Sequence, residues 1–247
     1  MVEFYIRLAD KLIFMRSRFR FAENFCRDYI ADAAPADISA VVADAELEAE
    51  MRQSEVPVSR ECAECLCLYR HIAERLPLFN RCVMHGAAIT YGENAYIFTA
   101  PSGTGKTTHI RLWEKYLGEW VDIVNGDKPI LHIEASAVTV FGTPWAGKEA
   151  LQKNRSAPLK AICIIKQAKE NKIAKVNPKE QLAVLLNQIY LPKDAVSAKK
   201  TLELFNILLN QIPIYVLECD MSEDAVQTSF KALTGQEYSQ RGKKNED

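Results

Sequence analysis

The sequence lacks an excess of either charge. Its 247 residues hold 31 Lys and Arg against 32 Asp and Glu, which gives a formal net charge of −1 at pH 7. A chain without a basic field is a poor partner for the phosphate backbone of nucleic acid or for an anionic membrane surface. We therefore expect partners that are neither nucleic acids nor membranes.

Long hydrophobic runs are also lacking, since no apolar stretch approaches the roughly 20 residues that a membrane-spanning helix needs. The first residues, Met1 to Arg7, do not show the basic-then-apolar order of a secretory signal peptide. The seven cysteines are odd in number and lie inside apolar patterns, which favours reduced thiols over a disulfide framework. Together these features predict a cytoplasmic protein.

What the sequence does contain is a glycine-rich loop between a predicted strand and a predicted helix. Residues 95–99 are an apolar run, residues 100–108 read Ala-Pro-Ser-Gly-Thr-Gly-Lys-Thr-Thr, and an amphipathic stretch follows over 109–117. This order is that of a phosphate-binding P-loop. Gly103 and Gly105 allow successive backbone N–H groups to point at one anion beside the N-terminus of the helix. The stretch therefore predicts a site for the phosphates of a nucleotide.

The side chains of the loop support this interpretation. Lys106 supplies a positive charge for the β- and γ-phosphates, and the Thr107 hydroxyl suits Mg²⁺, which prefers hard oxygen ligands. Ala100 stands where the strict motif has glycine, and its methyl group is the smallest intrusion there. A plain glycine turn would explain the glycines but not the adjacent Lys-Thr pair. The predicted cofactors are ATP and Mg²⁺, and the predicted nucleotide-binding residues are Pro101, Ser102, Gly103, Thr104, Gly105, Lys106, Thr107 and Thr108.

An acidic residue follows the next predicted strand along the chain. Residues 121–124 are a short apolar run, and Asn125-Gly126-Asp127 comes directly after it. A carboxylate at the end of the strand that follows a P-loop helix is where a magnesium ligand belongs. The alternative is an ordinary turn aspartate. We interpret Asp127 as a metal ligand that acts together with Thr107.

Around these motifs the patterns predict mixed α/β structure. On the helix after the loop, Ile110, Trp113 and Leu117 form a buried stripe, and His109 and Arg111 lie off it. The run at 81–90 is expected to form a hairpin with the strand that leads into the loop. Further predicted strands lie at 4–8, 11–15, 37–42, 129–133, 138–141, 159–167 and 212–217, and further helices at 21–30, from Ser59 to Leu76, from Asn177 to Tyr190, around 202–209 and from Ser222 to Leu233.

The chain is long enough for one large domain with a smaller attachment. We predict a small N-terminal α/β unit over residues 1–77 and a P-loop kinase-like nucleotide-binding domain over residues 78–238. The last residues, 239–247, are polar and charged, and we expect them to be disordered.

Three segments together resemble a known family. Met84-His85-Gly86, then the loop at 102–108, then Gly126-Asp127 resemble the nucleotide core shared by HPr kinase/phosphorylase and ATP-dependent phosphoenolpyruvate carboxykinase. The segment Phe141-Gly-Thr-Pro-Trp145 with Gly147-Lys148 resembles a group of bacterial HPr-kinase-like proteins, and the likeness runs from about residue 80 to 235. It implies a phosphoenolpyruvate carboxykinase-like P-loop core with a mixed β-sheet and flanking helices.

The resemblance also implies roles for individual residues. His85 would lie near the terminal phosphate or a metal, and Asp127 would hold metal or act as a base, so His85, Asp127 and Lys106 are the catalytic candidates. Taken alone, a histidine in an apolar strand is more often a core residue. The family usually shows two adjacent acids, whereas this chain has Gly126-Asp127. Lys148, Lys153 and Arg155 form a cationic cluster that fits either a phosphoryl clamp or a solvated loop.

The resulting hypothesis is an ATP- and Mg-dependent kinase that transfers the γ-phosphoryl group to a hydroxyl of a peptide, protein or small-molecule acceptor. The contrasting hypothesis is a non-catalytic or regulatory ATP-binding module, which Ala100 and the single acid at Asp127 favour. A carboxykinase is disfavoured because its chemistry needs a dicarboxylate site with several arginines and a second metal. Assembly into a homo-oligomer is compatible with the sequence.

Overall fold

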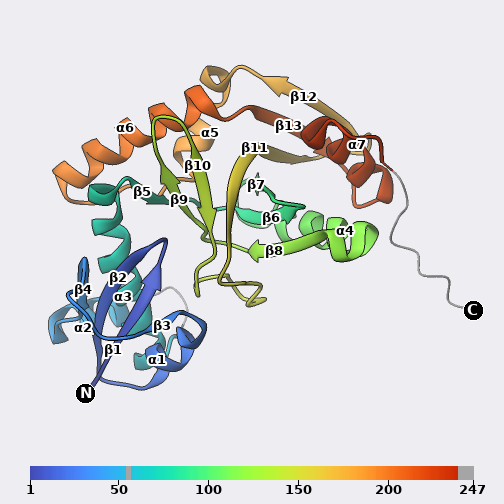
Figure 1. Cartoon of the computed structure of the whole chain (residues 1–247). Helices are drawn as coiled ribbons and strands as arrows, with labels where there is room; N and C mark the ends of the chain where they lie inside the picture. The colour runs from blue at the N-terminus through green and yellow to red at the C-terminus, as the bar shows by residue number, and fades with distance from the viewer. Residues whose placement is uncertain (54–56, 239–247) are drawn as a thin grey trace, which may run out of the picture.

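The structure, a computed structural model, describes residues 1–53 and 57–238 (Figure 1). The tail expected at 239–247 lies outside the described residues. Within the described residues the strands form a four-stranded sheet and a nine-stranded sheet. Figure 1 shows the smaller sheet near the N-terminus and the larger one as a curled surface with helices around it. The expected α/β class is therefore confirmed.

The four-stranded sheet has the order β3-β1-β2-β4, and three helices accompany it. Its first two strands form an antiparallel hairpin, and β4 pairs with β2 in parallel. The helix expected over 21–30 is wrong in length, because the helix ends at Phe25 and a 3-10 turn then leads into the edge strand β3. The elements are β1 (Val2–Leu8), β2 (Lys11–Ser17), α1 (Phe21–Phe25), β3 (Ile30–Ala31), β4 (Ile38–Val41), α2 (Asp44–Gln53) and α3 (Arg60–Arg75).

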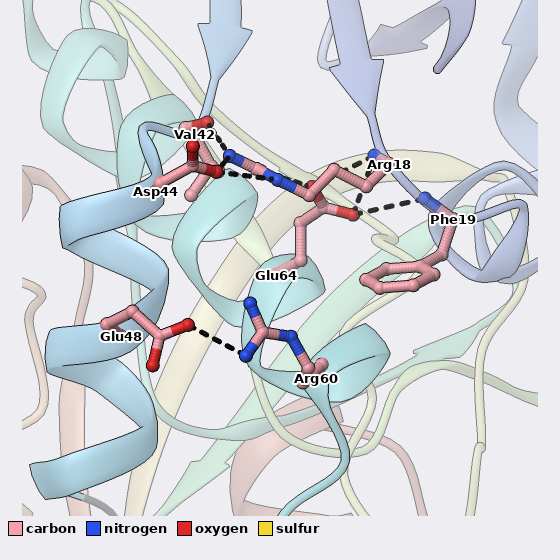
Figure 2. Close-up of polar contacts among 7 residues, drawn as sticks. All are labelled: Arg18, Phe19, Val42, Asp44, Glu48, Arg60 and Glu64. Carbon is pink, nitrogen blue, oxygen red and sulfur yellow. Dashed lines mark hydrogen bonds and ion pairs between the residues drawn. The ribbon is translucent and has the colours of Figure 1, made fainter.

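The buried carboxylate of Glu64 joins α3 to Arg18, the residue that follows β2 (Figure 2). Glu64 on α3 is 1% exposed and accepts hydrogen bonds from the backbone N–H and the guanidinium of Arg18. Arg18 also pairs with Asp44 at the start of α2, and Arg60 pairs with Glu48 on α2 at 2.7 Å. A buried charge is tolerated only when it is paired and hydrogen-bonded, so this cluster fixes where α2 and α3 pack.

The nine-stranded sheet is mixed, with the strand order β5-β9-β10-β11-β7-β6-β8 and with β13 between β11 and β12. The expected hairpin of β6 and β7 is confirmed, and β7 runs parallel to β11. Its elements are β5 (Arg81–Val83), β6 (Ala87–Tyr91), β7 (Asn94–Thr99), α4 (Lys106–Leu117), β8 (Val121–Asn125), β9 (Ile130–Ile133), β10 (Val138–Phe141), β11 (Ser156–Gln167), β12 (Lys172–Val176), α5 (Leu182–Leu186), α6 (Ala195–Gln211), β13 (Ile214–Cys219) and α7 (Glu223–Thr234).

Helices cover both faces of this sheet, and the side chains of β7 show how. Ala95 and Ile97 belong to a core cluster with α6, whereas Tyr96 and Phe98 belong to a second cluster with α4 and α7. Successive side chains of a strand point to opposite faces, so a nearly continuous apolar run is required here. The loop after β7 therefore leaves the middle of a rigid, two-sided core.

Two predicted elements of this region are wrong in extent. The run at 81–90 is broken between Val83 and Ala87, because β5 pairs with β9 while β6 pairs with β7, and the chain changes partners in between. Gly86 stands in the break, where a Cβ would lie 2.8 Å from Cγ2 of Ile97. The helix expected from Asn177 is a 3-10 turn followed by the short α5.

Serine side chains cap the two helices that were expected to begin at Ser59 and Ser222. The Ser59 side chain accepts a hydrogen bond from the N–H of Cys62, and that of Ser222 accepts one from the N–H of Ala225. Such caps satisfy backbone N–H groups that have no partner within the helix. No helix in residues 1–53 and 57–238 combines the length and the apolar composition that crossing a membrane requires.

Candidate functional site

The glycine-rich loop connects the end of β7 to the start of α4, in the order that the sequence predicts. Gly103 and Gly105 have φ values of +79° and +108°, in the region that favours glycine. Ala100 keeps a negative φ and is fully buried, so its methyl group is accommodated at the position where the strict motif has glycine.

Lys106 does not lie as expected. A phosphate-binding lysine is expected to face solvent, but only 7% of the residue is exposed, and Nζ donates hydrogen bonds to the carbonyl oxygens of Ala100 (2.9 Å) and Pro101 (3.3 Å). The side chain thus folds back onto the carbonyl oxygens of its own loop. Burial lowers the pKa of Lys106, while the negative charge of Asp127 acts against that shift.

One cavity of about 480 Å³ brings the predicted site residues together. Its walls come from the loop, from the break between β5 and β6, from the turn after β8 and from the connection between β10 and β11. The catalytic candidates His85, Lys106 and Asp127 all line it. Of the loop residues predicted to bind nucleotide, Ser102, Gly103, Gly105, Thr107 and Thr108 also line it, whereas Pro101 and Thr104 line adjoining cavities.

His85 and Asp127 form the centre of this cavity. Nε2 of His85 lies 3.2 Å from Oδ1 of Asp127. The backbone holds both residues: the N–H of His85 donates to the carbonyl of Gln188, the Thr99 hydroxyl donates to the carbonyl of His85, and the N–H of Gly86 donates to the carbonyl of Asp127. The His85 side chain is 35% exposed, so it is no core histidine.

A buried asparagine shapes the turn that presents Asp127. Oδ1 of Asn125 accepts hydrogen bonds from the N–H groups of Asp127 (2.9 Å) and Lys128 (2.6 Å), and its Nδ2 donates to the hydroxyl of Thr143 (3.0 Å). Both Asn125 and Thr143 are nearly fully buried. Neither residue was predicted to have a role, although an Asn two residues before the acid is the signal of such a turn.

His85 and Lys128 neighbour the Asp127 carboxylate. Burial opposes its ionisation, but the hydrogen bond from His85 and the ion pair with Lys128 outweigh burial and lower the pKa of Asp127 to about 2. The carboxylate is therefore an anion at neutral pH, which suits a cation ligand and makes it a weak base.

The second carboxylate of this cavity is Glu149. At Gly126, the residue before Asp127, a Cβ would lie 3.1 Å from the carbonyl oxygen of Ala146. Glu149 instead reaches the cavity from the β10–β11 connection and lies 3.5 Å from Arg111. Sequence reasoning missed Glu149, since nothing local marks it beyond the preceding Gly-Lys.

The predicted cationic cluster is divided by the structure. Lys148 lines the cavity, but Lys153 and Arg155 both pair with Asp122 on β8 and are absent from the cavity wall among the described residues. Asp122 lies on the strand before the site, and its position in the sheet could not be read from the sequence.

Two further cavities adjoin the loop. One of about 380 Å³ is lined by Thr108, Leu112, Ile165 and Met221, and another of about 530 Å³ lies against Pro101 and Thr104. The first also contacts His109, which was expected to lie off the buried stripe of α4. That expectation is wrong.

His109 is 2% exposed and packs in the core beside α7. Its ring contacts Phe98, and its Nε2 lies 3.1 Å from the hydroxyl of Ser229 and 3.2 Å from Nε1 of Trp113. Burial lowers the pKa of His109 to about 4, so the ring is neutral at pH 7.

The fold and cavity thus define a mixed α/β protein with a glycine-rich strand–loop–helix site. No protein-family model and no curated protein matches the sequence. Among solved structures, the Hpr(Ser) kinase/phosphatase from Coxiella burnetii is similar in 62% of this chain and 93% of that chain, with 9% identity and a TM-score of 0.35. The likeness is distant, and it carries no argument about this chain.

Proposed function

We propose that the chain is an ATP- and Mg-dependent kinase of the HPr-kinase-like type, built on a phosphoenolpyruvate carboxykinase-like P-loop core. It transfers the γ-phosphoryl group to a hydroxyl of a peptide, protein or small-molecule acceptor. The observation that carries this proposal is that three separate segments bring His85, Lys106, Thr107 and Asp127 to one cavity.

The loop holds the phosphates in this proposal. Its backbone N–H groups and the N-terminus of α4 attract the anion, and Lys106 exchanges the carbonyl oxygens of Ala100 and Pro101 for phosphate oxygens. The nucleoside extends past Thr108 into the 380 Å³ cavity, whose walls include the apolar Leu112, Ile165 and Met221. An apolar wall with a few polar groups is typical of a nucleoside site.

The residues present fit a magnesium ion. Thr107 and Asp127 are hard oxygen donors that line the same cavity. Within the described residues no three His, Cys, Asp or Glu side chains gather into a metal cluster. This donor set suits Mg²⁺, which usually keeps water and phosphate oxygens among its ligands. The bound ion would neutralise charge on the phosphates.

The remaining cavity residues receive roles from their positions. The ionised Asp127 orients His85, and the pair receives the proton of the acceptor hydroxyl. Lys148 offers a positive charge to the transferring phosphoryl group from the β10–β11 connection. With these groups in place, positioning and electrostatics supply the catalysis, as phosphoryl transfer requires.

A regulatory ATP-binding module is the second candidate. The low pKa of Asp127, which lies between His85 and Lys128, favours it because a carboxylate so stabilised is a weak proton acceptor. A carboxykinase fits less well, since no arginine is among the described residues that line the cavity. The cytoplasmic location and the homo-oligomer stay predictions, as does the division of the chain at residue 77.

The decisive experiment measures ADP formation from Mg-ATP by the purified protein, with and without a fraction of cell metabolites or peptides. A kinase forms ADP faster when its acceptor is present, and the added phosphoryl group appears on a component of that fraction. ATP binding without acceptor-dependent turnover identifies the regulatory module. Absence of ATP binding rejects both candidates.

A further inference from the structure

The connection between β10 and β11 belongs to the large sheet, yet one of its side chains lies in the core of the N-terminal unit. Trp145 is 6% exposed and joins the same buried cluster as Met15 and Leu47. Its ring centroid lies 5.0 Å from that of Tyr69 on α3 and 6.2 Å from that of Phe25 on α1. Figure 1 shows this connection between the two sheets.

The residues directly after Trp145 form a wall of the catalytic cavity. Ala146, Gly147, Lys148 and Glu149 all line it. Gly147 has a φ of +78°, and a Cβ at that position would lie 3.1 Å from Cβ of Asp127. A residue with a side chain is disfavoured at this position for two reasons: the positive φ, and the short distance between its Cβ and Asp127. The backbone at Gly147 therefore rests against the proposed metal ligand.

The other end of this wall is attached to the large sheet. The N–H of Gly126 donates to the carbonyl of Leu151 at 2.8 Å, and the N–H of Lys153 donates to the carbonyl of Val124 at 3.0 Å. Between these attachments and Trp145, residues 147–150 are exposed. Trp145 is the nearest large buried side chain on the N-terminal side of the wall, so its burial sets where the wall begins.

We propose that Trp145 is a positioning residue for phosphoryl transfer. Through it, the core of the N-terminal unit holds Gly147 against Asp127 and holds Lys148 in the cavity. The inference rests on the proposed kinase function and assigns a part in it to the N-terminal unit. The Trp145 ring packs against Tyr69 and Phe25. Its removal therefore affects turnover and spares nucleotide binding at the loop 101–108.

The test uses the full chain and three variants. Trp145→Ala removes the anchor, Trp145→Phe keeps an aromatic ring in the same core, and Met15→Ala is the matched control. Met15 is fully buried in the same cluster and lies on β2, away from the cavity wall. The control thus loosens the N-terminal unit without touching the wall. For each variant we measure kcat with Mg-ATP, the Kd for Mg-ATP by calorimetry, thermal unfolding, and hydrogen exchange over residues 146–151.

We expect Trp145→Ala to lower kcat roughly tenfold to a hundredfold, because small misplacements of catalytic groups cost rates of this order. The Kd should change by less than about threefold, and exchange over 146–151 should rise. Trp145→Phe should restore most of kcat. Met15→Ala should lower the unfolding temperature comparably while keeping kcat and the exchange of 146–151.

Three results would overturn the inference. The first is an unchanged kcat in Trp145→Ala when the parent is active. The second is a loss of kcat in Met15→Ala that matches its loss of stability. The third is unchanged exchange over 146–151 in Trp145→Ala. A parent protein that does not turn over Mg-ATP, whether or not it binds the nucleotide, instead rejects the kinase function itself, and the positioning role with it.

Discussion

Nε2 of His85 and Oδ1 of Asp127 lie 3.2 Å apart, although one residue follows β5 and the other follows β8. The hydrogen bond from the N–H of Gly86 to the carbonyl of Asp127 ties the two segments together beside this pair. A histidine that neighbours an ionised carboxylate is oriented by it.

The first prediction concerns the lysine of the loop. Lys106→Ala should abolish ATP binding within the range of calorimetry, because the variant loses the cation of the phosphate site. Its free energy of unfolding should fall by only about 1 kcal/mol, since two hydrogen bonds to loop carbonyls are lost. The control is Lys115→Ala, an exposed cation on the same helix. A Lys106→Ala protein that binds ATP like the parent would show that the loop is no phosphate site.

The second prediction concerns the proposed metal ligand. Asp127→Asn removes a negative charge but leaves the loop amides intact, so it should lower kcat by about two orders of magnitude or more and change Mg-free ATP affinity little. Steady-state kinetics and calorimetry with and without Mg²⁺ measure both. The control is Asp122→Asn. Asp122 lies on β8, the strand before Asp127, and pairs with Lys153 and Arg155. Equal losses in kcat and Mg-free affinity would indicate a folding role for Asp127.

The third prediction separates His85 as a catalytic group from His85 as a structural one. ATP places negative charge beside the ring, so the ring resonances of His85 should shift when Mg-ATP is added. NMR titration of the four histidines measures this, with the His85 signal assigned by His85→Asn. His71 on α3, which lines neither the phosphate cavity nor the 380 Å³ cavity, serves as an internal reference. An unmoved His85 resonance together with normal turnover of His85→Asn would remove it from the mechanism.

The fourth prediction concerns stability and pH. His109 has a pKa of about 4 in the folded protein, against about 6.5 when unfolded, so the unfolded state binds more protons between these values. Stability therefore falls as the pH is lowered through that window, by about 3 kcal/mol in total. The ring contacts Phe98, Trp113 and Ser229, which carry no charge that offsets this cost.

Urea unfolding at pH 7 and at pH 4.5 measures this effect, and His109→Gln provides the comparison because it cannot titrate. The parent should lose more stability than the variant between the two pH values. If both proteins lose the same amount, the acid sensitivity arises from carboxylates and not from His109.

Short-range features of this protein were predictable because their causes are local. Glycines at 103 and 105 permit positive φ, Ser59 and Ser222 cap the helices that follow them, and the alternation in β7 follows from burial on both faces. In contrast, the strand run at 81–90 was predicted as one element. Its break comes from a change of partner strand, which no local pattern encodes.

The strand–loop–helix at 95–117 and the acid after the next strand could be predicted from the amino-acid sequence alone, because each rests on neighbouring residues. Which distant groups share the cavity depends on the packing of the whole chain. In the folded chain Lys106 is buried. Lys153 and Arg155 pair with Asp122 instead of lining the cavity, and Glu149 lines it. The physical reason is that these placements depend on strand pairing and on the packing of Trp145 between the two sheets, which are long-range interactions that no local pattern of residues specifies.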